Sequence, residues 1–69
     1  MNKKGLYKHF KGKTYRVLYF AKDSETLENA VVYQNNTDAS DIWVRPQKMF
    51  FSKVIVDGTE VDRFQFIRE

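Results

Sequence analysis

Apolar and polar residues alternate along most of the chain, with the two-residue period that is typical of half-buried β-strands. No window of eleven or more residues keeps an apolar stripe at helical spacing. The alternation predicts strands over residues 6–10, 14–22, 28–34, 42–45, 51–56 and 61–67. The pattern therefore predicts an all-β protein of five to six short strands.

Two local signals interrupt this pattern. Pro46 is the only proline of the chain and follows Ile42-Trp43-Val44-Arg45. Proline has no N–H for a continuing strand ladder, so we expect the strand to stop there and a short helical turn to run from Pro46 to Met49, directing Met49 and Phe50 inward. The second signal is Asp57-Gly58, since both positions tolerate positive φ and predict a two-residue hairpin.

The length of 69 residues predicts one domain, residues 1–69. A chain of this size buries only roughly 60% of its unfolded surface, so unpaired strand edges would be a hazard. Closing the strands into a barrel removes those edges. We therefore expect a small SH3-like barrel. An OB-like barrel is the alternative, disfavoured because that fold needs a longer chain and a helix between strands.

Composition narrows this further. The chain has no Cys, which excludes disulfides and thiolate metal sites, and its eleven aromatic residues supply most of a small core. Lysines at 8, 11 and 13 interrupt any signal-peptide apolar region, and no apolar run approaches the roughly 20 residues of a membrane span. These features predict a cytoplasmic protein without membrane contact, and we expect a monomer.

The charges are unevenly distributed along the chain. Residues 1–22 carry seven basic side chains and no acidic one, whereas residues 23–69 carry five basic and nine acidic side chains. Such a division could place a positive face beside a negative one. The plainer interpretation is that both sets of charges solvate strand edges and loops, and the pattern favours neither.

Several segments together resemble a known family. They are Gly5-Leu6-Tyr7-Lys8-His9-Phe10-Lys11-Gly12-Lys13, Val17-Leu18, Ser24-Glu25-Thr26, Val31-Val32-Tyr33, Trp43-Val44-Arg45-Pro46 and Met49-Phe50-Phe51. In this order they resemble the bacterial family known as domain of unknown function 1653, from residue 5 to about residue 67. The resemblance implies a small SH3-like barrel and implies no activity, so no catalytic residue carries over. Asp23 stands where that family usually has His.

Trp43 and Arg45 lie two residues apart and so share one face of a strand, with Ile42 and Val44 facing the core. An exposed pair of this kind could stack on a ring or contact phosphate and carboxylate groups. The opposite arrangement stays open, in which Trp43 closes one end of the barrel and Arg45 pairs with an acid.

The only histidine, His9, shares a strand face with Tyr7. Alone it cannot form a two-histidine metal site, and as a general base it would need an orienting carboxylate such as Glu25 or Asp23. A half-exposed histidine with a backbone hydrogen bond is the favoured interpretation. The run Ser24-Glu25-Thr26 has no nucleophile elbow around it and is interpreted as a turn.

Basic residues with interleaved aromatic rings near the N-terminus favour a binding module without enzymatic activity, cofactor or metal. RNA or an acidic protein segment is the expected ligand. An alternative is a docking or regulatory domain that uses the Trp43–Phe51 surface, and an enzyme using His9 with Glu25 is the least favoured. The candidate ligand-binding residues are Tyr7, His9, Lys11, Glu25, Trp43 and Arg45.

Overall fold

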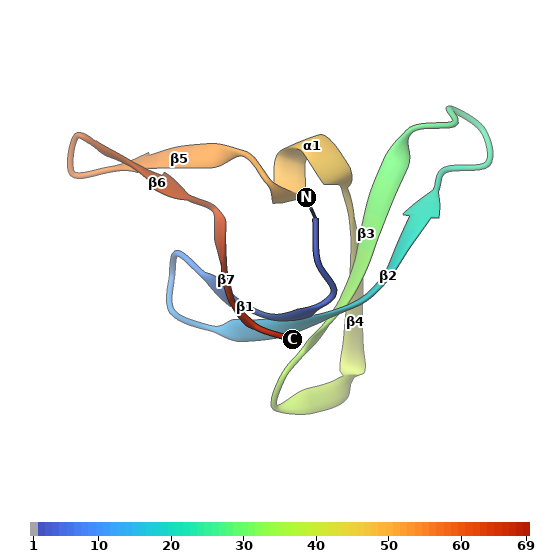
Figure 1. Ribbon diagram of the computed structural model, residues 1–69, viewed down its shortest axis with the longest axis horizontal. Coiled ribbons are helices and arrows are strands. Elements are labelled where there is room, and N and C mark those ends of the chain that lie inside the picture. The colour runs from blue at the N-terminus through green and yellow to red at the C-terminus, as the bar shows by residue number, and fades with distance from the viewer. Residues whose placement is uncertain (1) are drawn as a thin grey trace.

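The computed structural model describes residues 2–69, so Met1 of the predicted domain 1–69 lies outside the described residues. Seven strands and one helix follow one another along this part of the chain (Figure 1). They are β1 (Gly5–His9), β2 (Thr14–Lys22), β3 (Asn29–Asn35), β4 (Asp38–Pro46), α1 (Gln47–Phe50), β5 (Lys53–Val56), β6 (Thr59–Asp62) and β7 (Phe64–Arg68).

Five of the strands form one antiparallel sheet in the order β4-β3-β2-β1-β7. Strands β5 and β6 form a separate hairpin. Figure 1 shows this hairpin reaching away from β3 and β4, with α1 between them. The first and last strands are neighbours, since Tyr7 pairs with Phe66 and Lys8 with Gln65.

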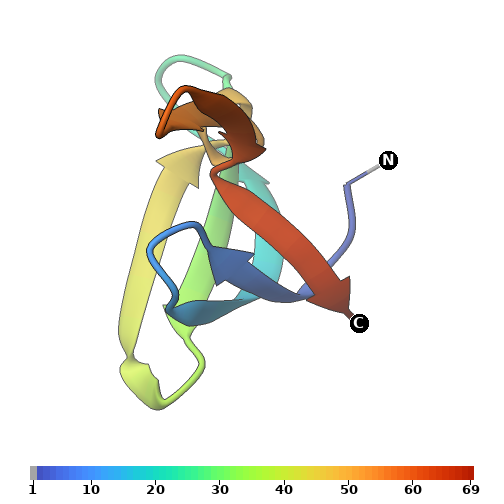
Figure 2. The same cartoon turned by 90° about the vertical axis from the view of Figure 1, so that its left-hand side faces the viewer.

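The all-β prediction is confirmed, but the closed barrel is not found. Within residues 2–69 the five-stranded sheet ends at β4 on one side and at β7 on the other, and these two strands are not paired. Figure 2 shows β4, in yellow, along one border of the molecule. Two edges therefore remain where closure would have removed them.

Both local turn signals are confirmed, although the helical turn runs from Gln47 to Phe50 and not from Pro46 to Met49. Asp57 and Gly58 both adopt positive φ, 50° and 78°, and connect β5 to β6 as a two-residue hairpin. Pro46 ends β4 and α1 begins at the next residue. Phe50 points inward and is fully buried, but Met49 is 47% exposed, so the inward orientation expected for Met49 is wrong.

The predicted last strand, 61–67, is divided into β6 and β7 at Arg63. The Arg63 N–H donates to the Ser52 carbonyl oxygen at 3.0 Å, and the Arg63 carbonyl accepts from the Phe10 N–H at 3.0 Å. Both backbone polar groups of Arg63 are thus bonded outside the β5–β6 ladder, and the ladder ends at Asp62. The number of strands therefore rises to seven.

The core lies on one face of the five-stranded sheet, which we call the covered face. Phe50 and Val31 have no exposed surface, and the rings of Phe50 and Phe64 stack at 4.0 Å with an interplanar angle of 5°. Residues from β1, β2, β3, α1 and β7 thus meet in one cluster, formed by Tyr7, Val17, Val31, Tyr33, Phe50 and Phe64.

The opposite face of the sheet, which we call the open face, is apolar near β4. Val44 pairs with Val32, which pairs with Tyr19, so the three side chains form a row across β4, β3 and β2. Ile42 is 55% and Val44 68% exposed. The expectation that Ile42 and Val44 fill the core is therefore wrong, because they face away from the side that α1 and Phe64 cover.

Within residues 2–69, no helix has the length and apolar character needed to cross a membrane.

Candidate functional site

A small cavity opens at the rim of the covered face. Its volume is about 100 Å³, and we call it the Arg45 pocket. It is lined by His9, Tyr15, Tyr33, Trp43, Arg45 and Phe64. Three of the residues predicted from sequence, His9, Trp43 and Arg45, are therefore brought together by the fold.

Strand pairing explains how β4 supplies this pocket. Trp43 lies opposite Tyr33 of β3, and Arg45 lies opposite Val31, so both side chains point to the covered face. Trp43 is nevertheless 52% exposed, because β4 is the last strand of the sheet. The prediction that Trp43 and Arg45 share a face is confirmed.

Arg45 is held by aromatic groups. Its Nε–H donates to the Tyr33 hydroxyl oxygen at 3.2 Å, and its guanidinium carbon lies 5.8 Å from the centre of the Phe64 ring. These contacts fix the plane of the guanidinium and leave its terminal N–H groups available for an anion. No carboxylate pairs with Arg45 in the part of the chain described, where the recorded ion pair joins Lys53 and Asp62.

His9 contributes a neutral ring to the pocket. Burial lowers the pKa of His9 below its ordinary value of 6.5, and the nearby charges of Arg45, Lys11 and Arg63 lower it further. The backbone N–H of Lys11 donates to His9 Nδ1 at 3.1 Å. Because Nδ1 accepts, the neutral ring carries its proton on Nε2, which is a donor.

The pocket therefore combines aromatic walls with N–H donors and contains no acidic side chain. The His9 ring packs edge-on against Phe64 at 4.8 Å, and Tyr15 packs edge-on against Tyr33 at 5.4 Å. A planar or anionic group of small volume has the complementary shape and charge.

The remaining predicted site residues lie elsewhere. Tyr7 is a core residue, 3% exposed, whose hydroxyl donates to the Lys3 carbonyl at 2.6 Å, and burial raises the pKa of Tyr7. Lys11 is exposed beside the pocket, with its Nζ 5.9 Å from the centre of the Phe10 ring. Glu25 is exposed in the turn after β2, at the opposite end of that nine-residue strand from His9.

Asp23 organises that distant turn. Its Oδ1 accepts the backbone N–H groups of Glu25 at 2.9 Å and Thr26 at 3.2 Å. In an Asx turn, a side-chain oxygen accepts hydrogen bonds from the backbone N–H groups two and three residues further along the chain. The interpretation of residues 24–26 as a turn is therefore confirmed, and Asp23 serves that turn.

Sequence reasoning missed Tyr15, Tyr33 and Phe64 as pocket residues. Alternation along β2 placed Tyr15 on one face, but no local signal shows that β7 lies beside β1 and brings Phe64 next to His9. The clue that the sequence did offer was the number of aromatic residues. Eleven rings in 69 residues exceed what the six-residue core cluster takes up.

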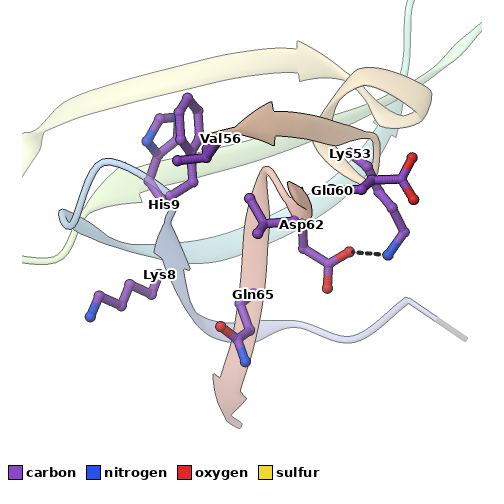
Figure 3. Close-up of a pocket in the computed structure, with 9 residues that line it drawn as sticks. Lys8, His9, Lys53, Val56, Glu60, Asp62 and Gln65 are labelled. Carbon is purple, nitrogen blue, oxygen red and sulfur yellow. Dashed lines mark hydrogen bonds and ion pairs between the residues drawn. The ribbon is translucent and has the colours of Figure 1, made fainter. Parts of the chain in front are cut away.

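A larger cavity of about 510 Å³ lies between β1, β7 and the β5–β6 hairpin. Figure 3 shows Lys8 and His9 at one side of it, Glu60 and Lys53 at the other, and Asp62 and Gln65 between them. Lys53 and Asp62 form an ion pair at 3.0 Å on its wall, which raises the pKa of Lys53. Because the carboxylates of Glu60 and Asp62 stand beside the two lysines of its lining, this cavity is less suited to an anion than the Arg45 pocket.

No group of three His, Asp or Glu side chains within residues 2–69 is arranged to hold a metal ion.

The fold and the pocket together define a class: a small all-β protein with an aromatic pocket that is rich in N–H donors. The chain belongs to the family described as "Protein of unknown function (DUF1653)", which matches residues 5–66. It is similar to the crystal structure of a DUF1653 protein from Bordetella bronchiseptica, with 26% identity and a TM-score of 0.86 over 96% of this chain and 87% of that chain. No curated protein matches the chain.

Proposed function

We propose that this protein is a non-enzymatic binding module that recognises single-stranded RNA at the Arg45 pocket. The observation that carries the proposal is the half-exposed indole of Trp43 beside the Arg45 guanidinium, in a cavity without acidic side chains. An exposed indole can stack on any of the four bases, and a guanidinium can donate two parallel hydrogen bonds to one phosphate.

Charge around the pocket supports RNA more than a single carboxylate. Lys11 lies close enough to His9 to lower the pKa of that ring, and Lys11 and Lys13 are both exposed in the turn that follows β1. Phe10, 37% exposed, lies 4.5 Å from the His9 ring and offers a second ring near the pocket. Spaced cations and rings suit a chain of phosphates and bases.

The positions of His9 and Glu25 support binding rather than catalysis. Glu25 lies at the far end of β2, and the groups that bear on His9 are the cations Arg45, Lys11 and Arg63. Because Nδ1 accepts the Lys11 N–H and Nε2 carries the proton, the neutral ring has no free lone pair with which to act as a general base. We therefore assign His9 the role of a hydrogen-bond donor in the pocket wall.

The test uses Trp43 as a reporter, because it is the only tryptophan of the chain. Stacking of a base on Trp43 should quench its fluorescence during titration with single-stranded oligouridine. The affinity should fall with salt by about 0.7 log units per neutralised phosphate for each tenfold rise in salt concentration. The affinity should be measured at low and at physiological salt concentration, once by Trp43 fluorescence and once by the anisotropy of labelled RNA.

Arg45→Met should weaken RNA binding at least about tenfold, because it removes the charge and keeps much of the side-chain volume. Arg68→Met, at the end of β7, is the matched control and should lose no more than the general charge effect. No binding, or equal losses for the two variants, would contradict the proposal. Binding of polyglutamate in place of RNA would identify an acidic protein segment as the ligand.

A second function, protein docking through the Trp43–Phe51 surface, is supported in part. Trp43 and Met49 are about half exposed, but Phe50 is fully buried, so the run does not form one surface. The exposed apolar side chains of this region are Ile42, Trp43 and Val44 of β4 and Met49 of α1.

A further inference from the structure

Strand β4 has an outer edge that no other strand of the described chain covers (Figure 2). It is nine residues long, and its ladder with β3 runs without a register shift from Pro46 to Ile42. Natural edge strands are usually protected by a lysine, a central proline or a bulge. The β3–β4 ladder is irregular between Asp38 and Ile42, which protects the first part of the edge, but from Ile42 to Val44 the edge has none of the three.

Both faces of β4 are apolar at its centre. Ile42 and Val44 on the open face are 55% and 68% exposed, and Trp43 on the covered face is 52% exposed. A regular stretch of edge strand with three exposed apolar side chains in a row, as at Ile42–Val44, is a site of intermolecular pairing unless it is occupied.

We propose that β4 pairs with β4 of a second copy of this chain, antiparallel, with Trp43 opposite the partner's Trp43. Two five-stranded sheets would then join into one continuous sheet across a two-fold axis that is perpendicular to it. The covered faces of the two copies lie on the same side of this sheet, because directly opposed residues point the same way.

The argument for a second copy is charge complementarity. The sequence Asp41-Ile42-Trp43-Val44-Arg45 is centred on Trp43. In the proposed register Asp41 lies opposite the partner's Arg45, and Arg45 opposite the partner's Asp41. Ile42 lies opposite the partner's Val44, so two ion pairs flank two apolar pairs and a central indole pair.

Neighbouring registers lose this match. A centre at Ile42 places Arg45 opposite the partner's Ala39 and Asp41 opposite the partner's Trp43. A centre at Asp41 places two Asp41 carboxylates directly opposite each other, which is unfavourable. The charges therefore select the Trp43 register.

The two charges cannot satisfy each other within one chain. Asp41 and Arg45 are four residues apart on one strand, which separates them by about 13 Å. Asp41 accepts a bond from Asn35 Nδ2 at 3.3 Å, and Arg45 donates through Nε to Tyr33. The terminal N–H groups of Arg45 remain free to contact the partner's Asp41.

The inference does not rest on RNA binding, but the two would compete, because the dimer covers Trp43 and uses the Arg45 N–H groups that line the proposed RNA site. It differs from the monomer expected from the sequence, because the edge of β4 is a property of the fold.

Sedimentation equilibrium measures the mass directly, and a dimer has twice the 8.2 kDa of one chain. The wild type should dimerise at concentrations up to about 1 mM, with a Trp43 emission maximum that moves to shorter wavelength on association. Asp41→Arg alone and Arg45→Asp alone should each raise the dissociation constant at least about tenfold, because each places like charges opposite one another.

An equimolar mixture of the Asp41→Arg and Arg45→Asp chains should form a heterodimer, because every charged pair is then complementary. The double variant carrying both substitutions should recover the homodimer. Circular dichroism of each variant checks that it is folded, and Lys48→Glu, outside β4, is the matched charge control.

A wild type that stays monomeric up to about 1 mM would overturn the proposal. So would a dimer that neither single substitution weakens, or a mixture of the two variants that stays monomeric, since either result means another interface. A monomer that instead binds a partner strand of a different protein along β4 would identify the edge as a site for another chain.

Discussion

The two faces of the five-stranded sheet differ in what lies over them. On the covered face, α1 and β7 place Phe50 and Phe64 over Val31 and Tyr33, and these side chains are at most 4% exposed. On the open face, Val44 presents an equally apolar side chain that is 68% exposed. Both faces belong to the same strands and both carry apolar side chains, so hydrophobicity alone did not decide which side chains are buried. The presence of a second layer did.

Removing a side chain from the covered face should give the largest effect. Phe50→Ala leaves a cavity beneath the stacked Phe64 ring and should reduce the free energy of unfolding by about 3–5 kcal/mol. A small domain with marginal stability would then be largely unfolded. Urea titration followed by circular dichroism measures the change.

Val44→Ala on the open face is the matched control and should change the free energy of unfolding by no more than about 0.5 kcal/mol at low protein concentration. A loss of similar size for Phe50→Ala and Val44→Ala would show that the open face is covered in solution.

A backbone substitution at the border of the sheet should have the next largest effect. Gly5 has φ 136°, and a Cβ added there would lie 2.5 Å from the Arg68 carbonyl oxygen, a backbone atom. Gly5→Ala should therefore strain the β1–β7 pair and reduce the free energy of unfolding by about 1–3 kcal/mol.

Gly12→Ala is the control for this position. Gly12 also has positive φ, 109°, but a Cβ there would meet no atom within 4 Å. The difference between the two variants in urea titration isolates the contact with Arg68. Equal losses would mean that φ alone matters at both positions.

A smaller effect is expected at the rim of the covered face, where His9 titrates. Its pKa is lowered in the folded protein, first by burial and then by nearby cations, from the ordinary value of 6.5. The unfolded chain therefore takes up the proton first, and stability falls as the pH drops below about 6.5. The contribution of the neutral His9 ring to the free energy of unfolding is fully present above that pH.

His9→Gln should lessen the loss of stability between about pH 6.5 and pH 5, measured as the urea midpoint at each pH. A loss on the acid side that is identical in wild type and variant would show that carboxylates alone account for it.

The smallest effect is expected on the β5–β6 hairpin, outside both faces. The Lys53–Asp62 ion pair measures 3.0 Å, but its side chains are 53% and 51% exposed. Lys53→Ala should leave the thermal midpoint unchanged within error, because solvent screens such pairs. A clear fall in the midpoint would mean that the hairpin packs against something more than solvent.

Local chemistry could be predicted from the sequence, whereas the layers could not. Asp57-Gly58 specifies its own turn through positive φ, and Pro46 ends its own strand, so both were found by reading a few residues. Alternation placed Trp43 and Arg45 on one face correctly. It also assigned Ile42 and Val44 to the core, because alternation separates two faces without showing which one a second layer covers.

The candidate site, too, could be predicted from the sequence only in part. Arg45 and Trp43 were found from their spacing, but Tyr33 and Phe64 reach the pocket through pairings between distant segments. Likewise, Tyr7 was predicted to line a binding surface together with His9, with which it shares a strand face. The ring of Phe50, supplied by α1, lies 5.3 Å from the Tyr7 ring and buries it. Such contacts depend on topology.

The adjacency of β1 and β7 has a consequence for how the protein is made. A ribosome releases β2, β3 and β4 in sequence, and each can pair with the strand just completed. The outer side of β1 must wait for Phe64–Arg68, which are synthesised after β2, β3 and β4. Because contacts between distant segments close large loops, this final pairing should set the folding rate, and the chain should reach its native state only after synthesis of β7 is complete.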